Sequence, residues 1–139
     1  MNDRYLFRAK RIDNGEWVFG SYVYTFCEDK NCPVVGVKVE KYWIVEESGN
    51  MVWVYEDTIC QCTGLKDKNG KLIWENDIVI DDNGNLYKAF WQDRYYQFSW
   101  ICVKSDKLPI GAKWDFWSIR SYEIDVIGNI FDNPELMHE

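Results

Sequence analysis

Tight turns constrain the fold of this chain more than any other sequence feature. Asn-Gly pairs stand at Asn14-Gly15, Asn69-Gly70 and Asn83-Gly84, and Ser48-Gly49-Asn50 adds a further turn signal. Asn and Gly accept the positive φ angles that a type I′ turn requires. Because residues that favour strands crowd the flanking segments, we expect β-hairpins closed by type I′ turns.

Alternation of apolar and polar residues predicts where the strands run. The clearest segments are residues 95–103 and 122–131, in which every second side chain is apolar. Residues 77–81 and 86–91 show a similar pattern, and less clear strand patterns cover residues 5–10, 17–24, 34–39, 42–45 and 51–55. Gly128-Asn129 interrupts the last strand, where we expect a β-bulge.

Helix signals are sparse. Asn133 can cap a helix, Pro134 suits the first helical position and Glu135 favours the positive end of the dipole, so we expect a short turn at Pro134–Met137. A second short helix or an irregular segment is expected at residues 107–113, around Pro109 and Gly111.

Many short strands separated by turns predict an all-β or β-rich α+β fold. We expect a small SH3-like or partly open β-barrel over residues 60–131, with an N-terminal β lobe and a short C-terminal helical turn. The length of 139 residues suits a single domain, 1–139, with the lobe at 1–59 and the barrel core and C-terminal turn at 60–139.

The composition indicates a cytoplasmic protein. No window approaches the roughly 18 uninterrupted apolar residues of a membrane span, and the first 15 residues lack the apolar region of a signal peptide. The five cysteines are an odd number and are widely spread, which argues against a disulfide framework.

Two blocks, residues 63–79 and 122–136, carry a recognisable order and spacing of motifs. Together with Phe7-Arg8-Ala9 and Gly15-Glu16-Trp17 they resemble the YopX family of phage and prophage proteins. This resemblance implies a shared fold and a place in a bacterial host cell, and it brings no known activity or cofactor. One departure is Asn76, where the family commonly has Gly before Asp-Ile; because Asn tolerates left-handed geometry, we expect the turn to be retained.

No pattern indicates catalysis or a metal, and we expect neither a catalytic residue nor a cofactor. Cys27, Cys32, Cys60 and Cys62 miss the usual spacing of zinc ligands, which favours buried free thiols. The single histidine, His138, lies in the tail. The carboxylates that would have to converge in a cleft for acid–base work are Glu75, Asp77, Asp81, Asp82, Glu123 and Asp125.

Aromatic residues are in excess, at 17% of the chain. Those that we single out as possible interface or binding residues are Trp91, Tyr95, Tyr96, Trp100, Trp114 and Trp117, with Phe116 beside them. Three interpretations stay open for them: core packing, a subunit interface, and stacking on single-stranded nucleic acid.

The net charge of −7 disfavours binding to nucleic acid, which normally requires a basic patch. We therefore expect an accessory protein that acts through protein–protein contacts, as a homo-oligomer and with an unknown phage or host protein. The alternative is a nucleic-acid-associated β-barrel that uses Arg4, Arg8, Lys10 and Arg11.

Overall fold

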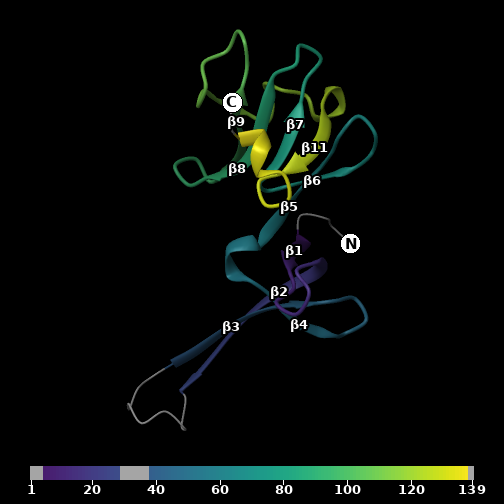
Figure 1. Ribbon diagram of the computed structural model, residues 1–139, viewed down its shortest axis with the longest axis vertical. Coiled ribbons are helices and arrows are strands. Elements are labelled where there is room, and N and C mark those ends of the chain that lie inside the picture. The colour runs from purple at the N-terminus through teal and green to yellow at the C-terminus, as the bar shows by residue number, and fades with distance from the viewer. Residues whose placement is uncertain (1–4, 29–37, 138–139) are drawn as a thin grey trace. The chain divides into compact units, whose positions relative to one another are not determined.

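The structure, a computed structural model, describes residues 5–28 and 38–137 (Figure 1). Residues 34–37 of one predicted strand, and with them Arg4, Cys32 and His138, lie outside the described residues. The chain forms two compact units: an N-terminal unit of Tyr5–Gln61, and a C-terminal unit that begins at Cys62.

The N-terminal unit is an antiparallel sheet of strands in the order β4-β3-β2-β1-β5. Its elements are β1 (Phe7–Lys10), β2 (Trp17–Glu28), β3 (Lys38–Val45), β4 (Met51–Trp53), the 3₁₀ turn η2 (Glu56–Thr58) and the start of β5 (Cys60–Lys66). The buried side chains that form its core are Ala9, Val18, Ile44, Val52 and Val54.

Strands β2 and β3 extend beyond this core as a two-stranded ribbon. They pair from Ser21↔Val45 to Glu28↔Lys38, whereas β1 pairs with β2 only from Trp17 to Gly20. We call residues 21–28 and 38–45 the β2–β3 ribbon. Side chains of its outer part are exposed on both faces, Tyr24 and Phe26 on one and Thr25 and Cys27 on the other, whereas Ile44 is buried in the core.

The C-terminal unit contains a second antiparallel sheet, in the order β10-β9-β8-β7-β11, and β6 pairs with the end of β5. Its strands are β6 (Leu72–Trp74), β7 (Asp77–Ile80), β8 (Leu86–Gln92), β9 (Gln97–Lys104), β10 (Lys113–Asp115) and β11 (Asp125–Asn129). The buried core side chains are Ile73, Val79, Tyr87, Ala89, Trp100, Cys102, Ile124 and Val126. The all-β prediction is confirmed, with two antiparallel sheets and no closed barrel within the described residues.

Two Asn-Gly turns share a construction that differs from the predicted one. The carbonyl oxygens of Asp67 and Asp81 accept the N–H groups of Gly70 and Gly84 at 3.0 and 3.1 Å. One carboxylate oxygen of each Asp also accepts the N–H of the Asn two residues ahead, at 2.9 Å. The glycines have φ of 81° and 82°, but among the described non-glycine residues only Asn76 and Tyr96 have a positive φ. The type I′ prediction is wrong, because the aspartate holds the Asn N–H and the glycine occupies the last position of the turn.

Two strand starts were predicted too early. Glu123 and Ile124 donate their N–H groups to the carbonyls of Arg120 and Ser121, which makes the 3₁₀ turn η3 (Ser121–Glu123) and delays β11 to Asp125. In the same way, Tyr95 donates its N–H to the carbonyl of Gln92 in a turn, and β9 begins at Gln97. Local turn hydrogen bonds therefore override the alternating pattern at both places.

The end of the chain follows the sequence prediction more closely. The register of β11 against β7 shifts between Val126 and Gly128, which confirms the bulge, and the 3₁₀ turn η4 occupies Pro134–Met137 as predicted. We expected the side chain of Asn133 to cap that turn. Instead, its Oδ1 accepts the N–H of Asn129 at 3.2 Å. Residues 107–112 form turns without a helix.

Candidate functional site

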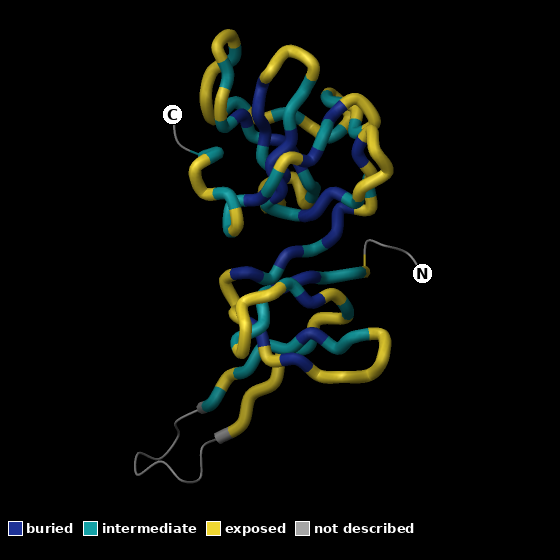
Figure 2. The backbone as a smooth tube through the Cα atoms, turned by 45° about the vertical axis from the view of Figure 1, so that its right-hand side comes forward, coloured by how far each residue is buried: buried dark blue, intermediate teal, exposed yellow. Residues whose placement is uncertain are grey.

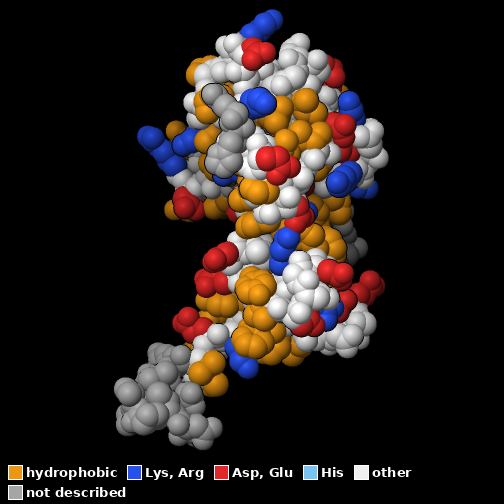
Figure 3. Space-filling model, in the orientation of Figure 1, with side chains coloured by type: hydrophobic (Ala, Val, Ile, Leu, Met, Phe, Trp, Pro, Cys, Tyr) orange, Lys and Arg blue, Asp and Glu red, His pale blue; other side chains and the backbone are white. Residues whose placement is uncertain are grey.

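A row of aromatic rings follows one face of the β2–β3 ribbon. We call Phe7, Tyr22, Tyr42, Tyr24 and Phe26 the aromatic face. Tyr22, Tyr24 and Phe26 are alternate residues of β2, and Tyr42 is the partner of Tyr24 across the strand pair. The ring centroids of successive members lie 5.7, 6.5, 5.2 and 6.1 Å apart, within the range of ring–ring contact. Figures 2 and 3 show that β2 stays exposed towards the end of the ribbon and that apolar side chains gather on this unit.

The aromatic face continues the N-terminal core. Phe7 and Tyr42 pack partly buried against that core, while Tyr24 and Phe26 are 42% and 57% exposed. A continuous row of exposed aromatic rings is characteristic of a binding surface.

Carboxylates line the aromatic face. The Tyr24 hydroxyl donates a hydrogen bond of 2.9 Å to Glu40, and this bond is the main cause that raises the pKa of Tyr24. Burial and a hydrogen bond to Glu56 raise the pKa of Tyr42 to about 12. These tyrosines therefore stay protonated at neutral pH and act as hydrogen-bond donors and flat apolar surfaces, not as acids.

The opposite face of the sheet carries two tryptophans and a lysine at β3 and β4. Trp43 and Trp53 are paired across β3 and β4, and the Lys41 ammonium lies 5.7 and 4.9 Å from their ring centroids. The Trp43 indole N–H also donates to the Thr25 hydroxyl at 2.8 Å. The ammonium group of Lys41 and the hydroxyl of Thr25 thus contact the rings of this face.

The aromatic residues singled out in the sequence are divided between core and surface. Trp100 is fully buried and stacks on Phe116 at 4.4 Å between centroids, so it fills the core. Trp114 is half-buried against the same core. The exposed ones are Trp91, Tyr95, Tyr96 and Trp117, of which Tyr96 and Trp117 are 82% and 91% exposed.

Of the basic residues of the nucleic-acid alternative, the structure describes Arg8, Lys10 and Arg11, and each of them contacts another side chain. Arg8 is 7% exposed, and its guanidinium lies 4.4 Å from the centroid of Trp17. Lys10 lies over the same ring at 5.3 Å. Arg11 forms an ion pair with Asp13 at 2.9 Å, which neutralises its charge.

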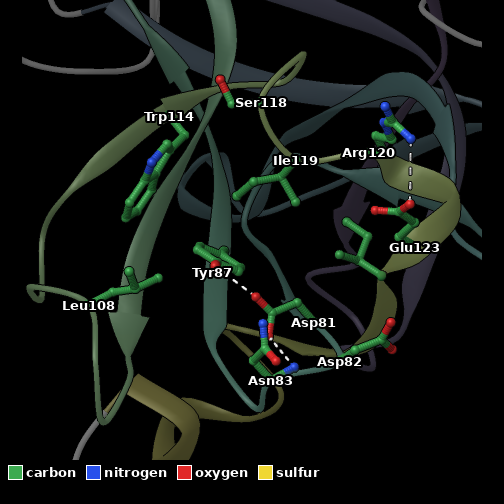
Figure 4. Close-up of a pocket in the computed structure, with 11 residues that line it drawn as sticks. Asp81, Asp82, Asn83, Tyr87, Leu108, Trp114, Ser118, Ile119, Arg120 and Glu123 are labelled. Carbon is green, nitrogen blue, oxygen red and sulfur yellow. Dashed lines mark hydrogen bonds and ion pairs between the residues drawn. The ribbon is translucent and has the colours of Figure 1, made fainter.

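A pocket of about 370 Å³ lies in the C-terminal unit (Figure 4). Tyr87 and Trp114 form part of its wall, and Arg120 and Glu123 face each other across 3.7 Å at its side. The other lining residues are Asp81, Asp82, Asn83, Leu108, Ser118, Ile119 and Ile124. The pocket thus brings together three of the six carboxylates singled out in the sequence, Asp81, Asp82 and Glu123.

The Asp81 carboxylate is held by hydrogen bonds from nearby residues of its own hairpin. Its carboxylate accepts hydrogen bonds from the backbone and side chain of Asn85, the N–H of Asn83 and the hydroxyl of Tyr87, each at 2.9 Å. Burial opposes ionisation of Asp81, but these donors outweigh it and lower its pKa. An ionised carboxylate with four donors has no capacity left to take up a proton near neutral pH.

The remaining predicted carboxylates lie apart from the pocket lining. The Asp77 side chain is buried and accepts the N–H of Trp74 at 2.8 Å, and Asp125 accepts a hydrogen bond from the Asn69 side chain at 2.9 Å. Glu75, in the turn between β6 and β7, does not line the pocket either.

The described cysteines are thiols in two different settings. Cys60, Cys62 and Cys102 are buried, and Cys27 is exposed. Burial raises the pKa of Cys102. Within residues 5–28 and 38–137, no group of three or more His, Cys, Asp or Glu side chains is placed to hold a metal ion.

The sequence prediction missed the aromatic face. Its signal was present as Tyr22, Tyr24 and Phe26 at every second position, but residues 17–24 were assigned only a weak strand, ending before Phe26. The strand continues to Glu28 because β3 pairs with it along its whole outer half.

Two comparisons with known proteins find similarity over nearly the whole chain. The family model described as "YopX protein" matches residues 6–138. A crystal structure of protein EF1440 from Enterococcus faecalis has a TM-score of 0.51 and 24% sequence identity, and the match covers 95% of this chain and 96% of that one. This likeness shows the fold alone. No curated protein matches the chain. None of the described helical segments has the length and apolar character of a membrane span.

Proposed function

Because the chain belongs to the YopX family, we propose that it is a phage- or prophage-encoded accessory protein of the host cytoplasm that acts by binding proteins, copies of itself included. The aromatic face carries this proposal. It presents tyrosine and phenylalanine rings at the exposed end of a ribbon, and such residues are enriched at protein–protein interfaces.

We further propose that the protein works without catalysis. The best-placed carboxylates, Asp67, Asp77 and Asp81, accept backbone N–H groups and hold turns together. A general acid or base requires a group that can exchange a proton in a cleft, and the lowered pKa of Asp81 argues against that role at the pocket.

Sedimentation velocity of the purified full chain tests self-association. We expect the sedimentation coefficient to rise with protein concentration up to about 100 µM, in the range of weak to moderate protein contacts. The double variant Tyr24→Ser/Phe26→Ser removes two exposed rings and is expected to shift the equilibrium to the monomer.

The matched control is Tyr122→Ser, which removes an exposed ring from the C-terminal unit and leaves the aromatic face intact. A wild-type protein that stays a monodisperse monomer throughout this range contradicts the self-association that we propose. The protein partner is then sought by affinity capture from lysogenic host cells, with the wild type and the double variant compared side by side.

A further inference from the structure

The outer half of β2 has an open edge. The pairing of β1 with β2 ends at Gly20, and among the described residues no other strand continues on that side. Along residues 21–27 no strand of the described part of the chain pairs with this edge, and a sheet is commonly extended by another chain at an edge of this kind.

The sequence of this edge carries neither charge nor proline, two features with which proteins protect open edges. The seven residues Ser21 to Cys27 include no charged residue and no proline, and Tyr22, Val23, Tyr24, Thr25 and Phe26 all favour strands. The ribbon's other strand is different: β3 carries the charged residues Glu40 and Lys41, and β4 covers its inner end. The ribbon is therefore protected on the β3 side and open on the β2 side.

The residues of the open edge are complementary to themselves. When the strand is placed antiparallel to its own copy with Tyr24 opposite Tyr24, Tyr22 stands opposite Phe26 and Val23 opposite Thr25. Each pair lies on one face of the sheet, and aromatic–aromatic and β-branched pairs are favourable cross-strand neighbours. The aromatic faces of the two copies then join into one surface.

We propose that two copies of this chain associate edge to edge through residues 21–27, with a twofold axis at Tyr24. This inference rests on the proposed function, because it names the surface through which self-association occurs. A second copy is the occupant that this edge fits: a chain of net charge −7 repels its own copies, and this uncharged segment lets the two strands meet without like charges in register.

Opposite charges at the axis test the proposal. Tyr24→Lys and Tyr24→Glu each place like charges opposite one another in a homodimer. We therefore expect the dimer dissociation constant of each variant alone to be at least tenfold higher than that of the wild type. A 1:1 mixture of the two variants places Lys opposite Glu, and we expect a heterodimer in sedimentation velocity. Circular dichroism verifies that both variants are folded.

The matched controls are Met51→Lys and Met51→Glu, which alter a similarly exposed residue on β4, and we expect both to associate like the wild type. Hydrogen exchange of the wild type supplies an independent measurement, because amides in residues 21–27 are expected to gain protection as concentration rises.

The proposed edge is overturned if either Tyr24 variant dimerises as tightly as the wild type, if the mixture forms no heterodimer, or if concentration protects only other segments. In those cases a self-associating wild type still supports the proposed function. A monomeric wild type contradicts both the self-association and the edge.

Discussion

At the scale of single residues, Asp67 shows how one carboxylate joins distant parts of the C-terminal unit. Its side chain is buried and accepts the N–H groups of Asn69, Lys71 and Val126, the last from a strand 59 residues further along the chain. Burial opposes ionisation of Asp67, but these N–H groups outweigh it and hold its pKa below the ordinary value.

Asp67→Ala is expected to lower the free energy of unfolding by about 2–3 kcal/mol, because it leaves buried N–H groups without an acceptor. Urea denaturation followed by circular dichroism measures this loss. The control is Asp82→Ala, an exposed aspartate in the equivalent second hairpin, for which we expect a change within about 0.5 kcal/mol. A loss for Asp67→Ala no larger than the control's would contradict the role assigned to Asp67.

The lowered pKa values of Asp67 and Asp81 also predict a pH dependence. Since both groups have a lower pKa in the folded state than in the unfolded chain, their contribution is fully present above the unfolded pKa of about 4 and is lost as the pH falls through the folded pKa. We expect the free energy of unfolding to decrease from about pH 5 downward.

Urea denaturation between pH 6 and pH 3 measures this decrease, and the double variant Asp67→Asn/Asp81→Asn is expected to show a shallower slope. An equal slope in the two proteins would show that other carboxylates cause the acid sensitivity. In the lower part of this pH range the aspartates of the unfolded chain take up protons before Asp67 and Asp81 of the folded protein do, which causes the loss of stability.

At the scale of elements, the bulge in β11 depends on close approach to the chain that follows it. A Cβ atom built on Gly128 lies 2.4 Å from the Oδ1 atom of Asn133, the atom that accepts the N–H of Asn129. In contrast, a Cβ atom on Gly70 meets nothing within 4 Å, although φ is +81° there. The two glycines are therefore required for different reasons: space at Gly128 and backbone conformation at Gly70.

Gly128→Ala is expected to destabilise the protein by about 1–3 kcal/mol through the steric clash, and Gly70→Ala by about 1 kcal/mol through backbone strain. A double-mutant cycle with Asn133→Ala separates the two causes. We expect the cost of Gly128→Ala to shrink when Asn133 is truncated and the cost of Gly70→Ala to stay the same. Independent, additive losses for Gly128 and Asn133 would argue against the clash.

At the scale of the whole molecule, net charge and the proposed contact surface work in opposite directions. A net charge of −7 makes copies repel one another, whereas residues 21–27 have no charge of their own. Salt screens the repulsion and leaves the apolar contact in place. We therefore expect the dissociation constant measured by sedimentation velocity to decrease as sodium chloride rises from about 50 to 500 mM, where the Debye length shortens to a few ångströms. Weaker association at high salt would instead indicate charge pairs between the copies.

Much of the order of the strands and turns could be predicted from the sequence, because the interactions that determine it are local. The alternating pattern located β8 and β9, glycine located the bulge at Gly128, and Pro134 located the last turn. Asn76 keeps the left-handed conformation, at φ 71°, that its place in the motif required. The starts of β9 and β11 were missed because local turn hydrogen bonds at Tyr95 and Ile124 compete with alternation.

The sequence by itself determined the class of fold, the family and most of the strands, because alternation, turn residues and motif spacing act over a few residues at a time. Only the tertiary structure decided which aromatic residues are core and which are surface: Trp100 and Trp117 look alike in the sequence, yet one is fully buried and the other 91% exposed. The Asn-Gly turns show the same division. Their positions follow from the sequence, whereas the role of Asp67 depends on Val126, which only the folded sheet brings within hydrogen-bonding distance.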